Sequence, residues 1–413
     1  MRISTSAIYD ANVSMLNLQQ AKLLHTQQQL ASGRRMLTPA DDPSASARAL
    51  EVTQSDSTNT QYATNRYAAK HSTSLSDSIL QSVTSLLQDV KTTAVQAGGG
   101  AMSSSDKQTL ATELSSRLGE LQALANSTDG IGNFLYSGFQ GRTQPFANSA
   151  AGVQYMADDG QRMIQVSSSR QMAASDSGAD IFMRIKNGNG TFIVQPDPSS
   201  NAGAGNAGTG VVSQGIVTNP AALTGNNYQV IFTVVPGVGG LPDVTTYDVY
   251  NSTTAPAPAG PALSTGNAYV SGQAISFAGM QFDVSGAPAN GDAFTISPSQ
   301  NESIFKTISD LIAAMSTTSA TFTNNLNKAL NKLDRDLDNV LTVRGSLGSR
   351  LNELDALQTT GEDLGLNFKS TLSQLQDVDY NKGISDLNQQ QLSLQAAQKS
   401  FKQVSDLSLF NYL

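Results

Sequence analysis

Two helical patterns with the same spacing lie near opposite ends of the chain. In each, apolar and Gln side chains recur at alternating intervals of three and four residues. The N-terminal positions are Val13, Leu16, Gln20, Leu23, Gln27 and Leu30. The C-terminal positions are Ile384, Leu387, Gln391, Leu394, Gln398 and Phe401. Because this spacing is typical of a coiled-coil seam, we expect the end helices to form an assembly interface, pairing with each other and with other subunits. The predicted interface also includes Leu407 and Leu409.

The charge content favours a surface that packs against other subunits. Charged residues make up 14% of the chain, well below the roughly 25% of typical soluble domains, and Ser, Thr, Asn and Gln replace them. A secreted protein with a neutral surface fits this composition equally well. The net charge of −8 argues against nucleic acid as a partner, because phosphate binding needs clustered Lys and Arg.

The sequence contains no export signal of the cleaved type. Residues 1–25 lack the apolar run of a signal peptide, and no stretch of about 18 apolar residues predicts membrane insertion. The chain has no cysteine, which excludes disulfides and thiolate metal sites. If the protein is extracellular, we expect it to leave the cell without a cleaved signal.

Breaks in the helical pattern predict a hinge. Helical patterns cover residues 1–38, 44–97 and 105–125, and helix returns at Ile304 and continues to about Leu407. Prolines end the first helix, and the acidic pair between them is suited to cap the next one. Two glycines divide the C-terminal helices at a comparable distance from the other end. The predicted hinge residues are Pro39, Asp41, Asp42, Pro43, Gly361 and Gly365.

The strongest heptad lies in the C-terminal half of the chain. Its positions are Leu326, Leu330, Leu333, Leu337, Val340, Arg344, Leu347, Leu351 and Leu354. Arg344 is the one interruption. Apolar stripes at residues 75–90 and 110–121 can pack against this heptad, which favours an intramolecular bundle. For the end seams we favour contacts between subunits, since polar seam residues weaken a lone helix pair and specify its register.

The pattern changes to β structure in the middle of the chain. Residues 153–156 and 163–166 flank Asp158-Asp159-Gly160, which predicts a hairpin. Short β-like runs then recur from 187 to 300 between Gly-, Pro- and Asn-rich segments. We therefore predict an α+β fold, with terminal coiled-coil helices, a long-helix bundle with a β-hairpin, and an inserted β-rich domain. The predicted domains are 1–43, 44–172, 173–299, 300–361 and 362–413.

Several segments resemble one known family. The segment from Leu30 to Ala47, LASGRRMLTPADDPSASA, resembles the signature that follows the first helix of bacterial flagellins and their hook-associated relatives. Other segments resemble the members of this family that join the hook to the filament. They are the opening MRISTSAIYDANV, NFLYSGF at 133–139, FDVSGAPANGDAF at 282–294 and SDLSLFNYL at 405–413. Residues 1–170 and 300–413 carry the resemblance, whereas 172–275 match only in composition.

The resemblance implies a secreted structural subunit of the extracellular flagellum. Such a subunit would self-associate into a ring between the hook, with its hook-associated protein 1, and the flagellin filament. It would be exported by the flagellar type III apparatus, with a cytosolic chaperone on its C-terminal helix. A filament-forming flagellin is a close alternative. An adhesin-like secreted protein that binds through the β insert is an alternative of another class.

No catalytic, cofactor or metal site is predicted. His25 and His71 are the only histidines, and neither has an acidic neighbour at a spacing that suits a Ser-His-Asp arrangement. The acidic pair at 41–42 is explained by capping, and 158–160 by a turn that lacks the acidic alternation of a calcium loop. The Gly-rich region 188–210 has no phosphate-binding motif. We therefore do not expect an enzyme.

Overall fold

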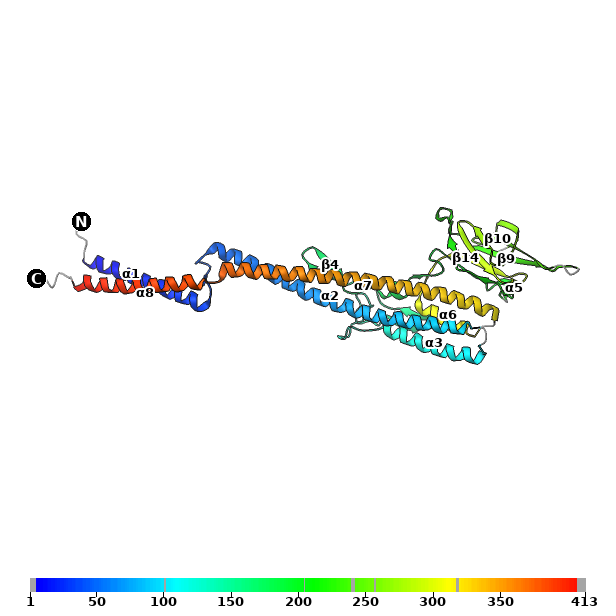
Figure 1. Cartoon of the computed structure of the whole chain (residues 1–413), viewed down its shortest axis with the longest axis horizontal. Coiled ribbons are helices and arrows are strands. Elements are labelled where there is room, and N and C mark those ends of the chain that lie inside the picture. The colour runs from blue at the N-terminus through cyan, green and yellow to red at the C-terminus, as the bar shows by residue number, and fades with distance from the viewer. Residues whose placement is uncertain are drawn as a thin grey trace. The chain divides into compact units, whose positions relative to one another are not determined.

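A computed structural model describes residues 5–99, 102–203, 205–238, 242–255, 258–316 and 319–406. It combines long helices with a β-rich region in the middle of the sequence (Figure 1), so the predicted α+β class is confirmed. The chain divides into two compact units, which we describe separately. The first unit contains Met1–Arg66, Val166–Ser169 and Asp355–Leu413, and the second contains Tyr67–Gln165 and Arg170–Leu354.

The first unit consists mainly of helices from the two ends of the sequence. Helices α1 (Thr5–Ser32) and α8 (Tyr380–Asp406) lie side by side (Figure 1). The start of α2 (Pro43–Ala97) and the end of α7 (Ser319–Gln376) also belong to this unit. The predicted pairing of the end helices is therefore confirmed. No helix in the described part of the chain is long and apolar enough to cross a membrane.

The second unit contains a helical bundle with one apolar core. The remainder of α2 and α7 packs with α3 (Ser104–Ala125) and α6 (Ile304–Ala314). A capping box between Ser103 and Asp106 begins α3. Heptad positions of α7 lie in this core, as the intramolecular prediction required. The buried ones are Leu326, Leu333, Val340, Leu347 and Leu354.

The arginine that interrupts the heptad has a partner within the bundle. The Nε of Arg344 on α7 lies 3.0 Å from Oδ1 of Asp77 on α2. Both side chains are partly buried. The interruption therefore marks an ion pair between the two long helices instead of a gap in the core.

Two hairpins follow α3, and they correct the predicted pairing. Strand β1 (Phe146–Ser149) pairs with β2 (Gly152–Tyr155). Strand β3 (Met163–Ser167) pairs with β4 (Arg170–Ala173). The predicted hairpin between 153–156 and 163–166 is therefore wrong. The Asp158 carboxylate, which lies between β2 and β3, accepts hydrogen bonds from the backbone of Phe139, Gln140 and Gly160, so it fixes a neighbouring loop instead of a turn.

The inserted region is an antiparallel β domain with its own core. Its larger sheet has the order β11-β10-β9-β14-β6. These strands are β6 (Phe192–Pro196), β9 (Tyr228–Val235), β10 (Val244–Asn251), β11 (Ala262–Ala268) and β14 (Ala293–Pro298). Strand β13 (Met280–Ser285) pairs with three shorter strands, β7 (Val211–Val212), β8 (Ile216–Val217) and β12 (Ala274–Phe277). The segment α5 (Ser200–Gly203) is a turn with left-handed backbone angles at Asn201 and Ala202, and η1 (Pro220–Ala222) is a short 3-10 helix. Phe232, Phe282 and Phe294 are buried in this core.

A two-residue stem connects the insert to the bundle. Strand β5 (Ile185–Lys186) pairs antiparallel with β15 (Asn301–Glu302), so the chain enters and leaves the insert at one place. Helix α4 (Gly178–Phe182) precedes the stem, and Ile181 and Phe182 lie in the core of the bundle. Residues just after the proposed boundary at 172 thus pack with the helices. We keep the five domains as a proposal and place the insert proper after Asn187.

Candidate functional site

The paired end helices form the candidate assembly interface. The rings of Tyr9 on α1 and Phe401 on α8 lie 5.2 Å apart. At the other end of the pair, Gly383 of α8 lies against Leu30 of α1, where an added Cβ would come within 2.8 Å of Leu30 Cδ2. The two helices are therefore antiparallel, and glycine at position 383 allows α8 to approach Leu30 closely.

The contact stripe between α1 and α8 uses only part of the predicted seam. Seven apolar residues of the predicted seam are partly buried in this stripe. They are Val13, Leu16, Leu23, Leu30, Leu387, Leu394 and Phe401. Ile384 is exposed, and so are all the predicted glutamines, Gln20, Gln27, Gln391 and Gln398. Neighbouring positions take their place: Thr26 is buried, and Gln19, Gln390 and Ala397 are partly buried. The exposed glutamines therefore lie outside the intramolecular contact. Their part in assembly stays a prediction.

Two glutamines in the observed stripe carry buried oxygens. The side-chain oxygens of Gln19 and Gln390 have no hydrogen-bond partner among the described residues. A buried polar group without a partner costs free energy, whereas polar seam residues favour one register over others. The helix pair thus combines partial burial with two buried side-chain oxygens that lack a partner among the described residues. Leu407 and Leu409, the remaining predicted interface residues, lie outside the described residues.

A joint connects the end helices to the long helices of the first unit. The N–H of Val378 donates to the Gly33 carbonyl at 2.9 Å, and the N–H of Arg35 donates to the Gln376 carbonyl at 2.7 Å. Arg35 also donates through Nη2 to the Leu375 carbonyl at 2.9 Å. The joint therefore brings the break after α1 against the break between α7 and α8.

Asp42 has the predicted capping role at the joint, whereas Asp41 holds the loop before it. Asp41 accepts the N–H groups of Leu37 and Thr38, both at 2.8 Å. Asp42 accepts the N–H of Ala45 at 3.0 Å, at the start of α2, where Pro43 is the first helical residue. These N–H donors lower the pKa of both carboxyls below the ordinary value, with Thr38 the largest influence on Asp41 and Ala45 on Asp42. Both carboxylates stay ionised and hold the turn.

The two predicted hinge glycines do not break a helix. Gly361 and Gly365 both lie within α7, which continues to Gln376, so the break predicted at these positions is wrong. Gly361 is buried, and a Cβ there would overlap the guanidinium of Arg66 on α2. Asn59 donates through Nδ2 to the Gly361 carbonyl at 2.7 Å. Glycine at position 361 makes room for Arg66 of α2. A single sequence does not distinguish such a packing glycine from one that breaks a helix.

The guanidinium of Arg66 also connects the helices to a hairpin. It is 3% exposed, and it donates to the Val166 carbonyl at 3.0 Å and to Oε1 of Gln358 at 2.9 Å. One buried arginine therefore binds α2, α7 and the end of β3. The sequence analysis missed it, because nothing local distinguishes this arginine from a surface residue.

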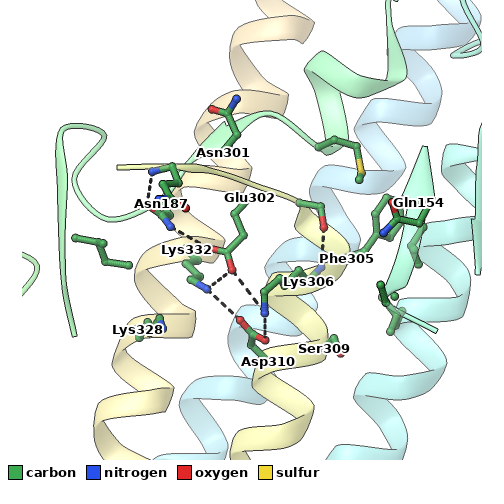
Figure 2. A pocket seen from close by; sticks show the side chains of 18 of the residues that line it. Gln154, Asn187, Asn301, Glu302, Phe305, Lys306, Ser309, Asp310, Lys328 and Lys332 are labelled. Atoms are coloured by element: carbon green, nitrogen blue, oxygen red, sulfur yellow. Dashed lines mark hydrogen bonds and ion pairs between the residues drawn. The ribbon is translucent and has the colours of Figure 1, made fainter. Parts of the chain in front are cut away.

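The second unit has a polar hollow of about 930 Å³ beside the stem of the insert (Figure 2). Lys332 of α7 is 4% exposed and lies 2.5 Å from Oε1 of Glu302 and 3.0 Å from Oδ2 of Asp310. Lys306 binds the other Asp310 oxygen at 2.6 Å. Burial opposes ionisation of Asp310, but the two lysines lower its pKa below the ordinary value. This network joins α6 and α7 to β15.

A buried carboxyl lies one turn beyond this network on α7. Asp336 is 2% exposed, and burial raises its pKa to about 7, with Glu302 adding to the shift and Thr307 and Lys332 opposing it. Its Oδ2 has no hydrogen-bond partner among the described residues. Among those residues, no group of three or more His, Cys, Asp or Glu could hold a metal ion. The ion pairs of Lys332 and Lys306 with Glu302 and Asp310 connect α6, α7 and β15.

Comparisons with known proteins relate this fold to the flagellin class. The family model described as the bacterial flagellin N-terminal helical region matches residues 3–141. The chain is 28% identical over 410 residues to flagellar hook-associated protein 3 of Salmonella typhimurium, covering 99% of each chain.

Two solved structures from Legionella pneumophila narrow the assignment. Flagellar hook-associated protein 3 is 32% identical, with a TM-score of 0.70, covering 78% of this chain and 98% of that one. The flagellar junction protein FlgL is also 32% identical, with a TM-score of 0.68, covering 80% of this chain and 100% of that one. The chain belongs to the hook-associated protein 3 (FlgL) family.

Proposed function

We propose that this chain is a structural subunit of the bacterial flagellum that forms the junction between hook and filament. The observation that carries this conclusion is the full-length similarity to hook-associated protein 3, together with the antiparallel pairing of the two end helices. A filament-forming flagellin explains the N-terminal match, but not the similarity of the entire chain to junction proteins. The relatives are structural flagellar proteins, and we propose no enzymatic activity.

The neighbours in the flagellum are hook-associated protein 1 on one side and flagellin on the other. We base this on the similarity to a flagellar junction protein and on the sequence segments that resemble the family members joining hook to filament. The low charge content and the partly buried end helices support self-association into a ring. Export by the flagellar type III apparatus and a chaperone on α8 complete the proposal. The exposed Leu392 and Ile384 offer apolar side chains on α8 to such a chaperone.

Deletion of the gene in its host tests this function. We expect cells with hooks but without filaments, and flagellin monomers in the medium. Expression of the intact chain restores filaments. A chain that supplies about one ring per flagellum is a junction protein, whereas thousands of copies per flagellum identify a filament subunit. Attached filaments in the deletion strain would contradict the proposal.

A further inference from the structure

The polar hollow beside the stem of the insert has an excess of positive charge. Among the described residues, its charged lining consists of three lysines, Lys306, Lys328 and Lys332, and two carboxylates, Glu302 and Asp310 (Figure 2). Lys332 binds both carboxylates, and Lys306 binds Asp310 at 2.6 Å. Each carboxylate is therefore already paired, which leaves one lysine in excess.

Lys328 of α7 is the lysine that lacks a carboxylate partner among the described residues. Its Nζ donates to Oε1 of Gln195, on β6 of the insert, at 2.6 Å. An amide oxygen satisfies the hydrogen bond but leaves the charge unbalanced. Burial, followed by the positive charge of Lys332, lowers the pKa of Lys328 below its ordinary value. Because charges withdrawn from water are normally paired, this ammonium group is where an added anion would be stabilised most.

Neutral hydrogen-bonding groups form much of the remaining wall of the hollow. They come from strand β2, from residues at the stem and from α6, and include Gln154, Asn187, Asn301 and Ser309 (Figure 2). Amides and hydroxyls can both donate and accept hydrogen bonds, so they suit a ligand with several hydroxyl groups. An apolar ligand would leave these groups without partners, at a cost in free energy. The volume of about 930 Å³ lies within the range of small-molecule sites, roughly 300–1,000 Å³.

We propose that this hollow binds a small carboxylate that carries several hydroxyl groups, as sugar acids do, and that Lys328 pairs with the carboxylate. The pair is a charge-assisted hydrogen bond, which is stronger than a bond to a neutral amide, and it balances the charge of the hollow. The hydroxyl groups bond to the amides of the wall. Since the β1–β2 hairpin, α6, α7 and the insert all line the hollow, a bound ligand holds the insert against the bundle.

Calorimetric titration of the purified full chain with glucuronate tests the site, and glucose serves as the uncharged probe with the same ring. We expect saturable binding of glucuronate, binding of glucose that is weaker by about tenfold or more, and an unfolding temperature that rises with glucuronate concentration. Lys328→Gln should weaken glucuronate binding by about tenfold or more. Lys186→Gln is the matched control, since Lys186 is an exposed lysine of the stem, and it should bind as the parent does.

Chemical protection locates the ligand and does not depend on a variant. Glucuronate should slow acetylation of Lys328 by acetic anhydride, read by peptide mass spectrometry, and leave Lys186 unaffected. If Lys328→Gln does not fold, this measurement on the parent protein decides instead.

Three results would overturn the proposal and leave the junction function intact. They are no saturable binding of glucuronate at millimolar concentration, equal affinity for glucose, and unchanged glucuronate binding by folded Lys328→Gln. Protection of Lys328 in assembled flagella, together with an isolated chain that does not bind glucuronate, would also refute it. That result would identify an acidic side chain of a neighbouring subunit as the occupant.

Discussion

The guanidinium of Arg66 fills the space beside Gly361 where a side chain would otherwise begin. This contact joins α2 to α7 in the first unit, and it explains a glycine in the middle of a continuous helix. Glycine costs about 1 kcal/mol relative to alanine within a helix. The packing of the buried arginine therefore outweighs a local preference for alanine.

Substitution Gly361→Ala should lower stability, since its Cβ would displace Arg66. We expect a loss of about 1–3 kcal/mol, as for other overpacked sites, measured by thermal unfolding. Gly348→Ala is the matched control in the same helix, because an added Cβ there meets no atom within 4 Å. The control should gain up to about 1 kcal/mol. Equal gains in both variants would contradict the Arg66 contact.

Asp336 should make stability depend on pH. Below about pH 4 its carboxyl is protonated in both states. Between pH 4 and 7 the unfolded chain loses the proton while the folded protein, with its pKa raised to about 7, retains it. The free energy of unfolding therefore falls as pH rises through this window and then levels off. Lys332 attracts the ionised form and Glu302 repels it.

The variant Asp336→Asn removes this effect. Its free energy of unfolding at pH 8 should exceed that of the parent by up to roughly 4 kcal/mol, the equivalent of about three pKa units, with little difference at pH 4. Urea unfolding at both pH values measures this. Asp338→Asn, at an exposed position of the same helix, should change neither value. A parent stability that is flat between pH 4 and 8 would refute the prediction.

Leu394→Asp should separate the end helices, because a charge would enter the partly buried stripe between α1 and α8 without a partner. Phe401→Asp should act in the same way, through its contact with Tyr9. Filament attachment should be lost while the second unit stays folded. Gln398→Asp is the control, since Gln398 is exposed on the same helix. Attachment counts by electron microscopy and thermal unfolding distinguish the outcomes.

Removal of the β insert should leave a folded helical protein. The deletion runs from Gly188 to Ser299, and a Gly-Ser bridge joins Asn187 to Gln300 across the paired stem strands. Helix content per residue by circular dichroism should rise, and motility should fall only modestly. A longer deletion, Ala173–Pro298, is the control and should unfold, because it removes Phe182 from the bundle core. If the protein with the shorter deletion is folded and exported but its cells are non-motile, the insert makes a contact that is essential for motility.

Patterns within one element were predictable, whereas choices between neighbouring partners were not. The heptad from Leu326 was found because its apolar spacing repeats within one helix. Gln20 was placed in the seam instead of Gln19, since both fit a spacing of three or four from the same leucines.

The same limit explains the remaining errors at the candidate site. Asp158 was assigned to a turn, because its partners at Phe139 and Gln140 are distant in sequence. Gly361 was assigned to a break, because its reason is Arg66, on another helix. In both cases a tertiary contact decides the local conformation, and a single sequence carries no record of that contact.

The stem of β5 and β15 makes this chain a natural acceptor for foreign domains. Paired antiparallel strands hold their Cα atoms about 5 Å apart, and Lys186 faces Asn301 in this arrangement. Any domain whose own termini lie that close together can replace the insert without stretching the strands below it. Display of enzymes or antigens at the base of a filament would then need only an exchange of sequence between Asn187 and Gln300.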